Sequence, residues 1–170
     1  MSQRIRVALR DFDWPSEQLG ELRASNELLG DRVALQARMA EDGYLLLRDF
    51  LDRETVLAGR RRLLEFLQPA ILPGTDLMDG IIAPGLQAGL PRDTGKDPKI
   101  RAVLENPRLF EFFATYFAEP ALTFDNKWMR AVGHGGFTGA HYDVVYMGRG
   151  SPQLHTVWTP FGDIRAEQGT

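Results

Sequence analysis

Apolar residues recur at helical spacing in three parts of the chain. The first follows Asp31, a suitable N-cap, and Gly43 suits the left-handed position that commonly ends a helix. The second follows Asp52 and stops near Pro69, since helices commonly end at or before the residue preceding a proline. The third begins at Pro107, because proline is favoured at the first helical position. We interpret its largely aromatic stripe as core packing: Leu109, Phe110, Phe113 and Phe117.

The pattern is different outside these predicted helices. Residues 44–47 form a short apolar run that is typical of a buried strand. Four prolines and five glycines between Ile71 and Lys99 predict a long irregular loop, of a kind that often forms lids or binding walls. Residues 1–30 have no sustained period and predict an irregular extension with a short helix near residues 16–22. Strand-like segments begin late and cover 121–132, 141–147 and 154–159.

Helices first and strands later predict an α+β fold in a single domain over residues 1–170. In this interpretation residues 31–120 are mainly helical, with the loop 71–99 within them, and residues 121–170 begin the sheet region. A chain of 170 residues is long enough to bury one sizeable core.

Composition narrows the function classes. The net charge of −3 does not favour nucleic-acid binding. Three adjacent arginines, Arg60 to Arg62, fan around the second predicted helix and are expected to be solvated. The absence of cysteine excludes disulfides, thiolate metal sites and a cysteine nucleophile. No apolar run has the length of a signal peptide or a membrane span, so we predict a cytoplasmic protein without nucleic-acid or membrane partners.

One histidine has a carboxylate close by in the chain. Residues i and i+2 of a strand share a face, so His141 and Asp143 can point the same way while Tyr142 points to the other side. An imidazole beside a carboxylate is two thirds of the facial triad that holds iron(II) and leaves positions open for a co-substrate and dioxygen. His-x-Asp alone recurs by chance in many chains and favours a structural or surface role.

The two other histidines are predicted to lie outside this pair. His134 belongs to a glycine-rich turn, where a solvent-exposed or substrate-facing side chain is expected. His155 precedes Trp158 by three positions and would therefore face the opposite side of a strand. We exclude His155 as a third ligand for this reason.

The residues around the motif resemble the phytanoyl-CoA dioxygenase family of iron(II)- and 2-oxoglutarate-dependent oxygenases. The resemblance covers roughly Ala34 to Thr170, and its most specific part is the His-x-Asp motif followed by Trp158 and the Gln168-Gly169 turn. The similar segments, in chain order, are Glu41 to Leu51, Asn106 to Phe110, Trp128 to Arg130, Gly133 to Gly139, His141 to Asp143, Leu154 to Trp158 and Glu167 to Gly169.

The resemblance implies a fold, a reaction and a set of site residues. It implies a jelly roll whose first strands lie in residues 121–170, and it assigns His141 and Asp143 as the first two iron ligands. Trp158 matches a position that packs beside 2-oxoglutarate, and this role is compatible with that of a buried core tryptophan. Asn126 matches another contact to this co-substrate. Arg130 either reaches the pocket or is a solvated strand residue.

The implied reaction uses dioxygen and 2-oxoglutarate to hydroxylate a small organic substrate. An intact Asp143 favours hydroxylation over halogenation, because related halogenases have a small residue there so that chloride can bind. The substrate and the oligomeric state are not identified, and no residues resemble a recognition element for a coenzyme A thioester.

The sequence departs from the family pattern after Asp143. A distal histidine ligand and an arginine for the far carboxylate of 2-oxoglutarate are expected several strands later, whereas the chain ends at residue 170, 27 residues on. We therefore expect an incomplete jelly roll that binds iron poorly unless the other half is supplied. Two rival interpretations remain: a cupin-like protein that binds zinc or manganese, and an inactive barrel fragment that acts as a binding module.

Overall fold

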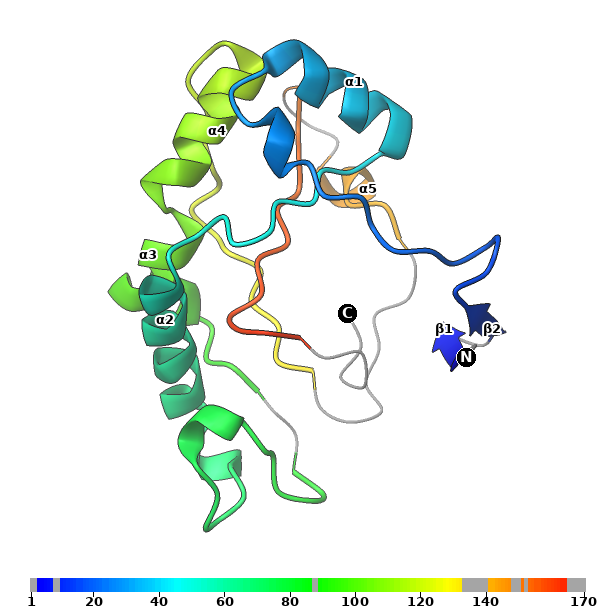
Figure 1. Ribbon diagram of the computed structural model, residues 1–170. Coiled ribbons are helices and arrows are strands. Elements are labelled where there is room, and N and C mark those ends of the chain that lie inside the picture. Colours follow the sequence, from blue (N-terminus) through cyan, green and yellow to red (C-terminus); the bar gives the residue numbers. More distant parts are fainter. Residues whose placement is uncertain are drawn as a thin grey trace.

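The computed structural model describes residues 3–7, 10–86, 89–132, 141–147, 151 and 153–164. These residues form a mixture of helices and strands, as the sequence predicts in general terms (Figure 1). The α-helices are α1 (Arg32–Asp42), α2 (Arg53–Phe66), α3 (Pro98–Leu104), α4 (Pro107–Phe117) and α5 (Val144–Met147). One 3-10 turn, η1 (Asn26–Leu28), precedes α1, and three lie between α2 and α3: η2 (Gln68–Ala70), η3 (Leu77–Asp79) and η4 (Thr94–Lys96).

The long predicted helices are confirmed, and so are their caps. The Asp31 carboxylate accepts a hydrogen bond from the backbone N–H of Ala34, and Gly43 ends α1 with a φ of 76°. Asp52 caps α2 in the same way. Pro107 is the first residue of α4. These boundaries were predictable because a cap depends on residues three or four positions apart.

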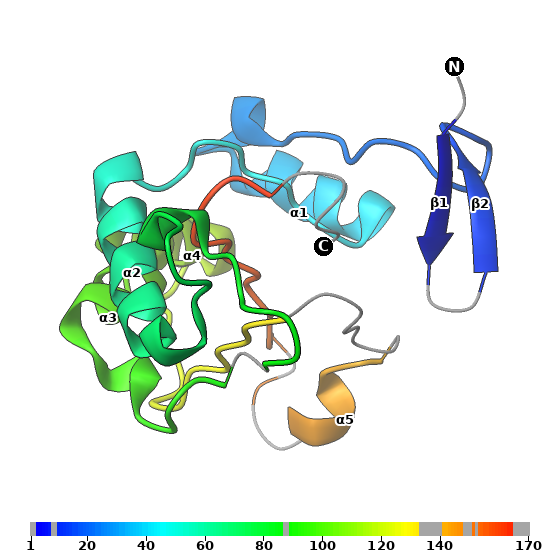
Figure 2. The same cartoon turned by 90° about the horizontal axis from the view of Figure 1, so that it is seen from below.

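An antiparallel hairpin at the N-terminus corrects the prediction that residues 1–30 are irregular. Strands β1 (Gln3–Val7) and β2 (Arg10–Trp14) pair so that Ile5 lies opposite Phe12. The helix predicted near residues 16–22 is not formed. Figures 1 and 2 show the hairpin set apart from the helices. Both strands do alternate polar and apolar residues, with Ile5 and Val7 in β1 and Phe12 and Trp14 in β2, a signal that the sequence analysis overlooked.

Helix α3 lies partly within the predicted loop 71–99 and was not predicted. Its seven residues span less than two full turns, which is too short for a clear apolar period. Asp97 caps α3, and its carboxylate also pairs with Arg62 of α2, with 2.7 Å between Nε and Oδ2. Ile100 and Val103 are completely buried. The helix is therefore held by contacts with residues distant in sequence.

The core lies where α2 packs against α3 and the segment near residue 161. Gly59 permits this approach, because an added Cβ would lie 2.8 Å from a methyl group of Val103 and 2.8 Å from the Phe161 ring. At the end of α2 and just beyond it, the buried residues Leu64, Leu67 and Ile71 form a cluster that partly buried apolar residues cover. The covering residues are Leu77, Met78, Ile82, Leu90 and Ala131.

The adjacent arginines of α2 do not all behave as predicted. Arg60 is half-buried, and its guanidinium donates hydrogen bonds to the carbonyls of Met78 (2.8 Å) and Phe161 (3.3 Å). Arg62 pairs with Asp97. Only Arg61 is exposed. Positions 60 and 62 therefore join α2 to other segments, whereas the sequence predicted three solvated side chains.

The segments predicted as later strands contain no strand among their described residues. Residues 144–147 form the short helix α5, which corrects the predicted strand 141–147. Residues 44–47 contribute only an isolated bridge between Leu46 and Ala24. Leu122 is 97% exposed, because residues 121–132 pair with no described strand that could bury one side of them. The described residues therefore contain a two-stranded sheet, and a jelly roll is not shown.

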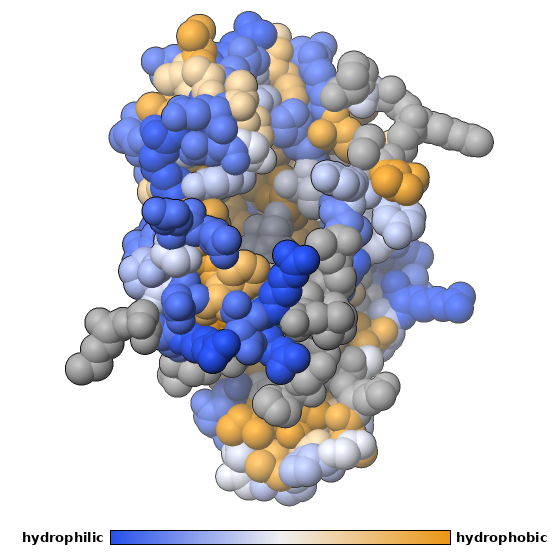
Figure 3. Space-filling view, turned by 90° about the vertical axis from the view of Figure 1, so that its right-hand side faces the viewer, coloured by the Kyte–Doolittle hydropathy of each residue, from blue (hydrophilic) through white to orange (hydrophobic). Residues whose placement is uncertain are grey.

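Some apolar side chains remain on the surface. In Figure 3 they gather at the end of the molecule formed by the segment after α2, and in a recess near the middle of the same face. Ile81 and Leu86, both after α2, are about half exposed. Within the described ranges, every helix is too short or too polar to cross a membrane.

Candidate metal site and a separate pocket

His141 and Asp143 lie side by side immediately before and at the start of α5. The imidazole Nε2 is 3.2 Å from Oδ1 of Asp143, and each side chain is about one third exposed. The backbone carbonyl of Asp143 accepts hydrogen bonds from Tyr146 and Met147. The two side chains therefore meet in the turn that begins a helix, whereas the sequence predicted two positions on one face of a strand.

The separation of these atoms suits ligands of one metal ion. Ligand atoms about 2.1 Å from a metal and about 90° apart lie about 3 Å from each other. Oδ2 of Asp143 accepts a hydrogen bond of 2.7 Å from the Thr156 hydroxyl, which fixes the rotation of the carboxylate. Oδ1 then faces the imidazole at ion-pair distance, and the same spacing would suit one nitrogen and one oxygen ligand of a metal ion.

Thr156 is a part of the site that the sequence analysis missed. The preceding residue, His155, packs against the aromatic rings of Phe113, Tyr116 and Phe117, at centroid distances between 5.1 and 6.1 Å. Helix α4 thus holds the segment that carries the Thr156 hydroxyl. The sequence contains both Thr156 and Asp143, but nothing in it indicates a hydrogen bond between two residues that are 13 positions apart.

His155 faces α4, so the structure gives it a packing role. Its Nδ1 also lies 3.0 Å from the Gln153 carbonyl oxygen. His134 lies outside the described residues. Across the described ranges, three or more His, Asp or Glu side chains do not gather where they could hold a metal ion. His141 and Asp143 are the sequence-predicted ligands that the structure brings together.

The other predicted site residues lie in different surroundings. Asn126 lines a pocket of about 190 Å³ between residues 90–95 and 126–129. Trp158 is 65% exposed and is not part of that lining. Arg130 is exposed and follows the last lining residue, Met129. Trp158 therefore lies outside the pocket that Asn126 lines.

The two walls of this pocket approach closely at Gly95. A Cβ at Gly95 would lie 3.0 Å from Cβ of Lys127. The Lys127 side chain is largely buried, and its ammonium group pairs with Glu105 at 2.9 Å, with Thr123 and the Phe124 carbonyl as further partners. These contacts hold the wall that carries Asn126.

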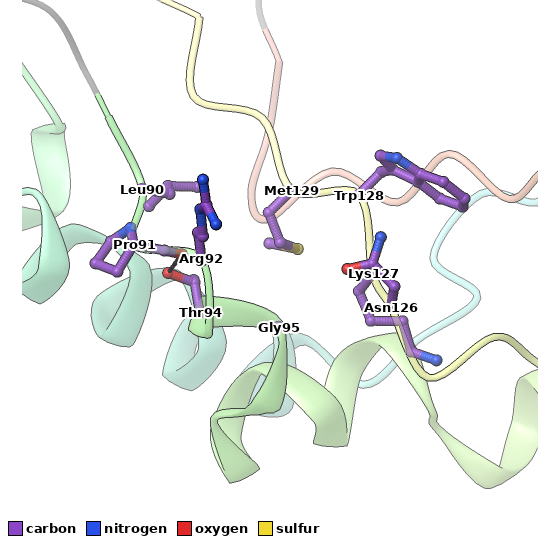
Figure 4. Close-up of a pocket in the computed structure, with 9 residues that line it drawn as sticks. All are labelled: Leu90, Pro91, Arg92, Thr94, Gly95, Asn126, Lys127, Trp128 and Met129. Atoms are coloured by element: carbon purple, nitrogen blue, oxygen red, sulfur yellow. Dashed lines mark hydrogen bonds between the residues drawn. The ribbon is translucent and has the colours of Figure 1, made fainter.

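The opposite wall is also held by internal contacts. Thr94 is buried, and its hydroxyl donates a hydrogen bond of 2.7 Å to the Pro91 carbonyl. Figure 4 shows the side chains of Arg92 and Met129 projecting toward each other across the opening, while the Trp128 indole turns away. The pocket therefore has a cationic and an apolar group facing each other. Its complete lining is Leu90, Pro91, Arg92, Thr94, Gly95, Asn126, Lys127, Trp128 and Met129.

Comparison of the chain with protein-family models, with curated proteins and with solved structures finds no match in any of the three.

Proposed function

We propose that this chain carries the His-x-Asp part of the iron site of a 2-oxoglutarate-dependent dioxygenase that hydroxylates a small organic substrate. The observation that carries the proposal is the 3.2 Å contact between His141 Nε2 and Asp143 Oδ1. The family resemblance around these residues supports the choice of iron over other metals. It is also the basis for proposing a jelly roll around the site.

Each residue of the proposed site has a distinct task. His141 and Asp143 would hold iron(II), and Thr156 would keep the Asp143 carboxylate turned toward the imidazole. Iron(II) with 2-oxoglutarate supplies the oxidising power to insert oxygen from dioxygen into a C–H bond. Asn126 is proposed as a contact to 2-oxoglutarate because it matches such a position in the family. Trp158 is proposed beside 2-oxoglutarate on the resemblance alone.

An anaerobic titration tests this proposal. Iron(II) is added to the chain in the presence of 2-oxoglutarate, and the visible charge-transfer band of the chelated keto acid is followed. We expect the band for the wild-type chain at high iron concentration. His141→Ala and Asp143→Ala should each weaken iron binding by about tenfold or more, because loss of even a second-shell partner weakens metal binding by about 10–100-fold.

The matched control is a carboxylate outside the site. Asp79→Ala, at an exposed position, should leave iron binding unchanged, provided that circular dichroism shows it folded. Equal iron affinity in the wild-type chain and both ligand variants would overturn the proposal. Tight binding of zinc or manganese at His141 and Asp143 without the charge-transfer band would instead favour the cupin-like alternative.

A further inference from the structure

The pocket beside Asn126 is distinctive for its charge. Its lining contains two cationic side chains, Arg92 and Lys127, and no carboxylate, in a chain whose net charge is −3. The Lys127 ammonium is neutralised by Glu105. Among the described residues the Arg92 guanidinium has no hydrogen bond or ion pair, so its charge remains available to a ligand.

We propose that this pocket binds a small carboxylate, with Arg92 as the anion-binding residue and Asn126 as a second polar contact. A guanidinium presents parallel N–H donors that match the two oxygens of a carboxylate. The Asn126 side chain makes no hydrogen bond within the described chain, and its amide N–H can donate to the same anion. This inference requires no metal at His141 and Asp143.

The rest of the lining favours a carboxylate on a short carbon chain over inorganic phosphate. Leu90 and Met129 supply apolar surface for methylene groups. The Thr94 hydroxyl already donates its hydrogen to Pro91, so it is not available to donate to an anion. A phosphate dianion is usually bound by several backbone N–H groups or cations, whereas Arg92 is the one unpaired cation among the described lining residues.

The pocket is held before any ligand binds. Gly95 allows the two walls to touch, and the Glu105–Lys127 pair anchors the wall of residues 126–129. A ligand would therefore meet Arg92 and Asn126 on two supported segments, which lowers the entropy lost on binding.

Isothermal titration of the metal-free chain with succinate tests the inference. We expect saturable binding that Arg92→Gln weakens by about tenfold or more, because hydrogen bonds to charged groups are stronger than those between neutral groups. Asn126→Ala should weaken it by a smaller factor. The matched control is Lys96→Gln, because Lys96 follows Arg92 by four residues, pairs with Asp93 and does not line the pocket.

Three further arms make the result specific. Succinamide, which lacks the charge, should not bind, and inorganic phosphate should bind more weakly than succinate. His141→Ala should bind succinate like the wild-type chain, so this test can succeed where the iron proposal fails. No saturable succinate binding, an unchanged affinity in Arg92→Gln, or phosphate binding at least as tight as succinate binding would each overturn the inference.

Discussion

At the scale of single residues, the orientation of Asp143 depends on a side chain from another segment. The carboxylate has two oxygens, and the Thr156 hydroxyl takes one of them while the other faces His141. The contact joins residues 13 positions apart. Thr156 is in turn held by the packing of its neighbour His155 on α4. We therefore infer that Thr156 is a positioning residue for the metal ligands.

This role predicts a graded effect of substitutions at Thr156. Thr156→Val keeps the shape but removes the donor, so the Asp143 carboxylate can rotate and iron(II) affinity should fall by about tenfold. Thr156→Ser restores the hydroxyl and should return most of the affinity. Both are measured by the same anaerobic iron titration. Equal iron affinity in the Val and Ser variants would show that the hydroxyl does not position the ligand.

At the scale of elements, sequence pattern predicted what is local and failed for what is not. Helices α1, α2 and α4 were predictable because caps and apolar stripes depend on residues within a few positions of each other. The hairpin was missed although both of its strands alternate, and α3 was missed because seven residues give no clear apolar period. The strands expected in residues 121–159 were wrong among the described residues because strand formation needs a partner strand, which local alternation cannot supply.

The packing of α2 against α3 gives a prediction at this scale. Gly59→Ala places a methyl group 2.8 Å from Val103 and from Phe161, so the helices must move apart. We expect the free energy of unfolding to fall by about 1–3 kcal/mol, as for overpacked cores. Urea denaturation measures it. Gly20→Ala is the control, because an added Cβ there meets nothing within 4 Å. Equal stability of the two variants would contradict this account of the interface.

At the scale of the whole molecule, the candidate site was only partly predictable. The spacing of His141 and Asp143 indicated that they could share a metal, and the structure brings their side chains together, although in a turn. The pocket of Arg92 and Asn126 was not predictable as a unit, because it joins segments more than 30 positions apart. Trp158 remains a proposal from resemblance, since the indole is largely exposed and outside this pocket.

The stability of the whole chain should depend on pH through Asp97. Burial raises the pKa of this carboxyl, but hydrogen bonds from Arg62 and from the backbone N–H of Lys99 outweigh it, so the pKa lies below its usual value. Asp97 is therefore ionised more readily when folded than when unfolded. Its contribution to stability is complete above the unfolded pKa of about 3.9, and it is lost as the pH falls through the lower folded value.

Asp97→Asn isolates the charge, because asparagine also caps helices well and can keep the bond to Lys99. We expect the variant to be less stable than the wild-type chain at pH 7 and the difference to shrink as the pH falls below about 4. Urea denaturation from pH 7 to pH 2.5 measures both quantities, and Asp79→Asn, at an exposed carboxylate, is the control. A difference that is the same at both ends of this range would mean that the Arg62–Asp97 ion pair does not contribute through its charge. The join between α2 and α3 would then depend on the packing of Ile100 and Val103.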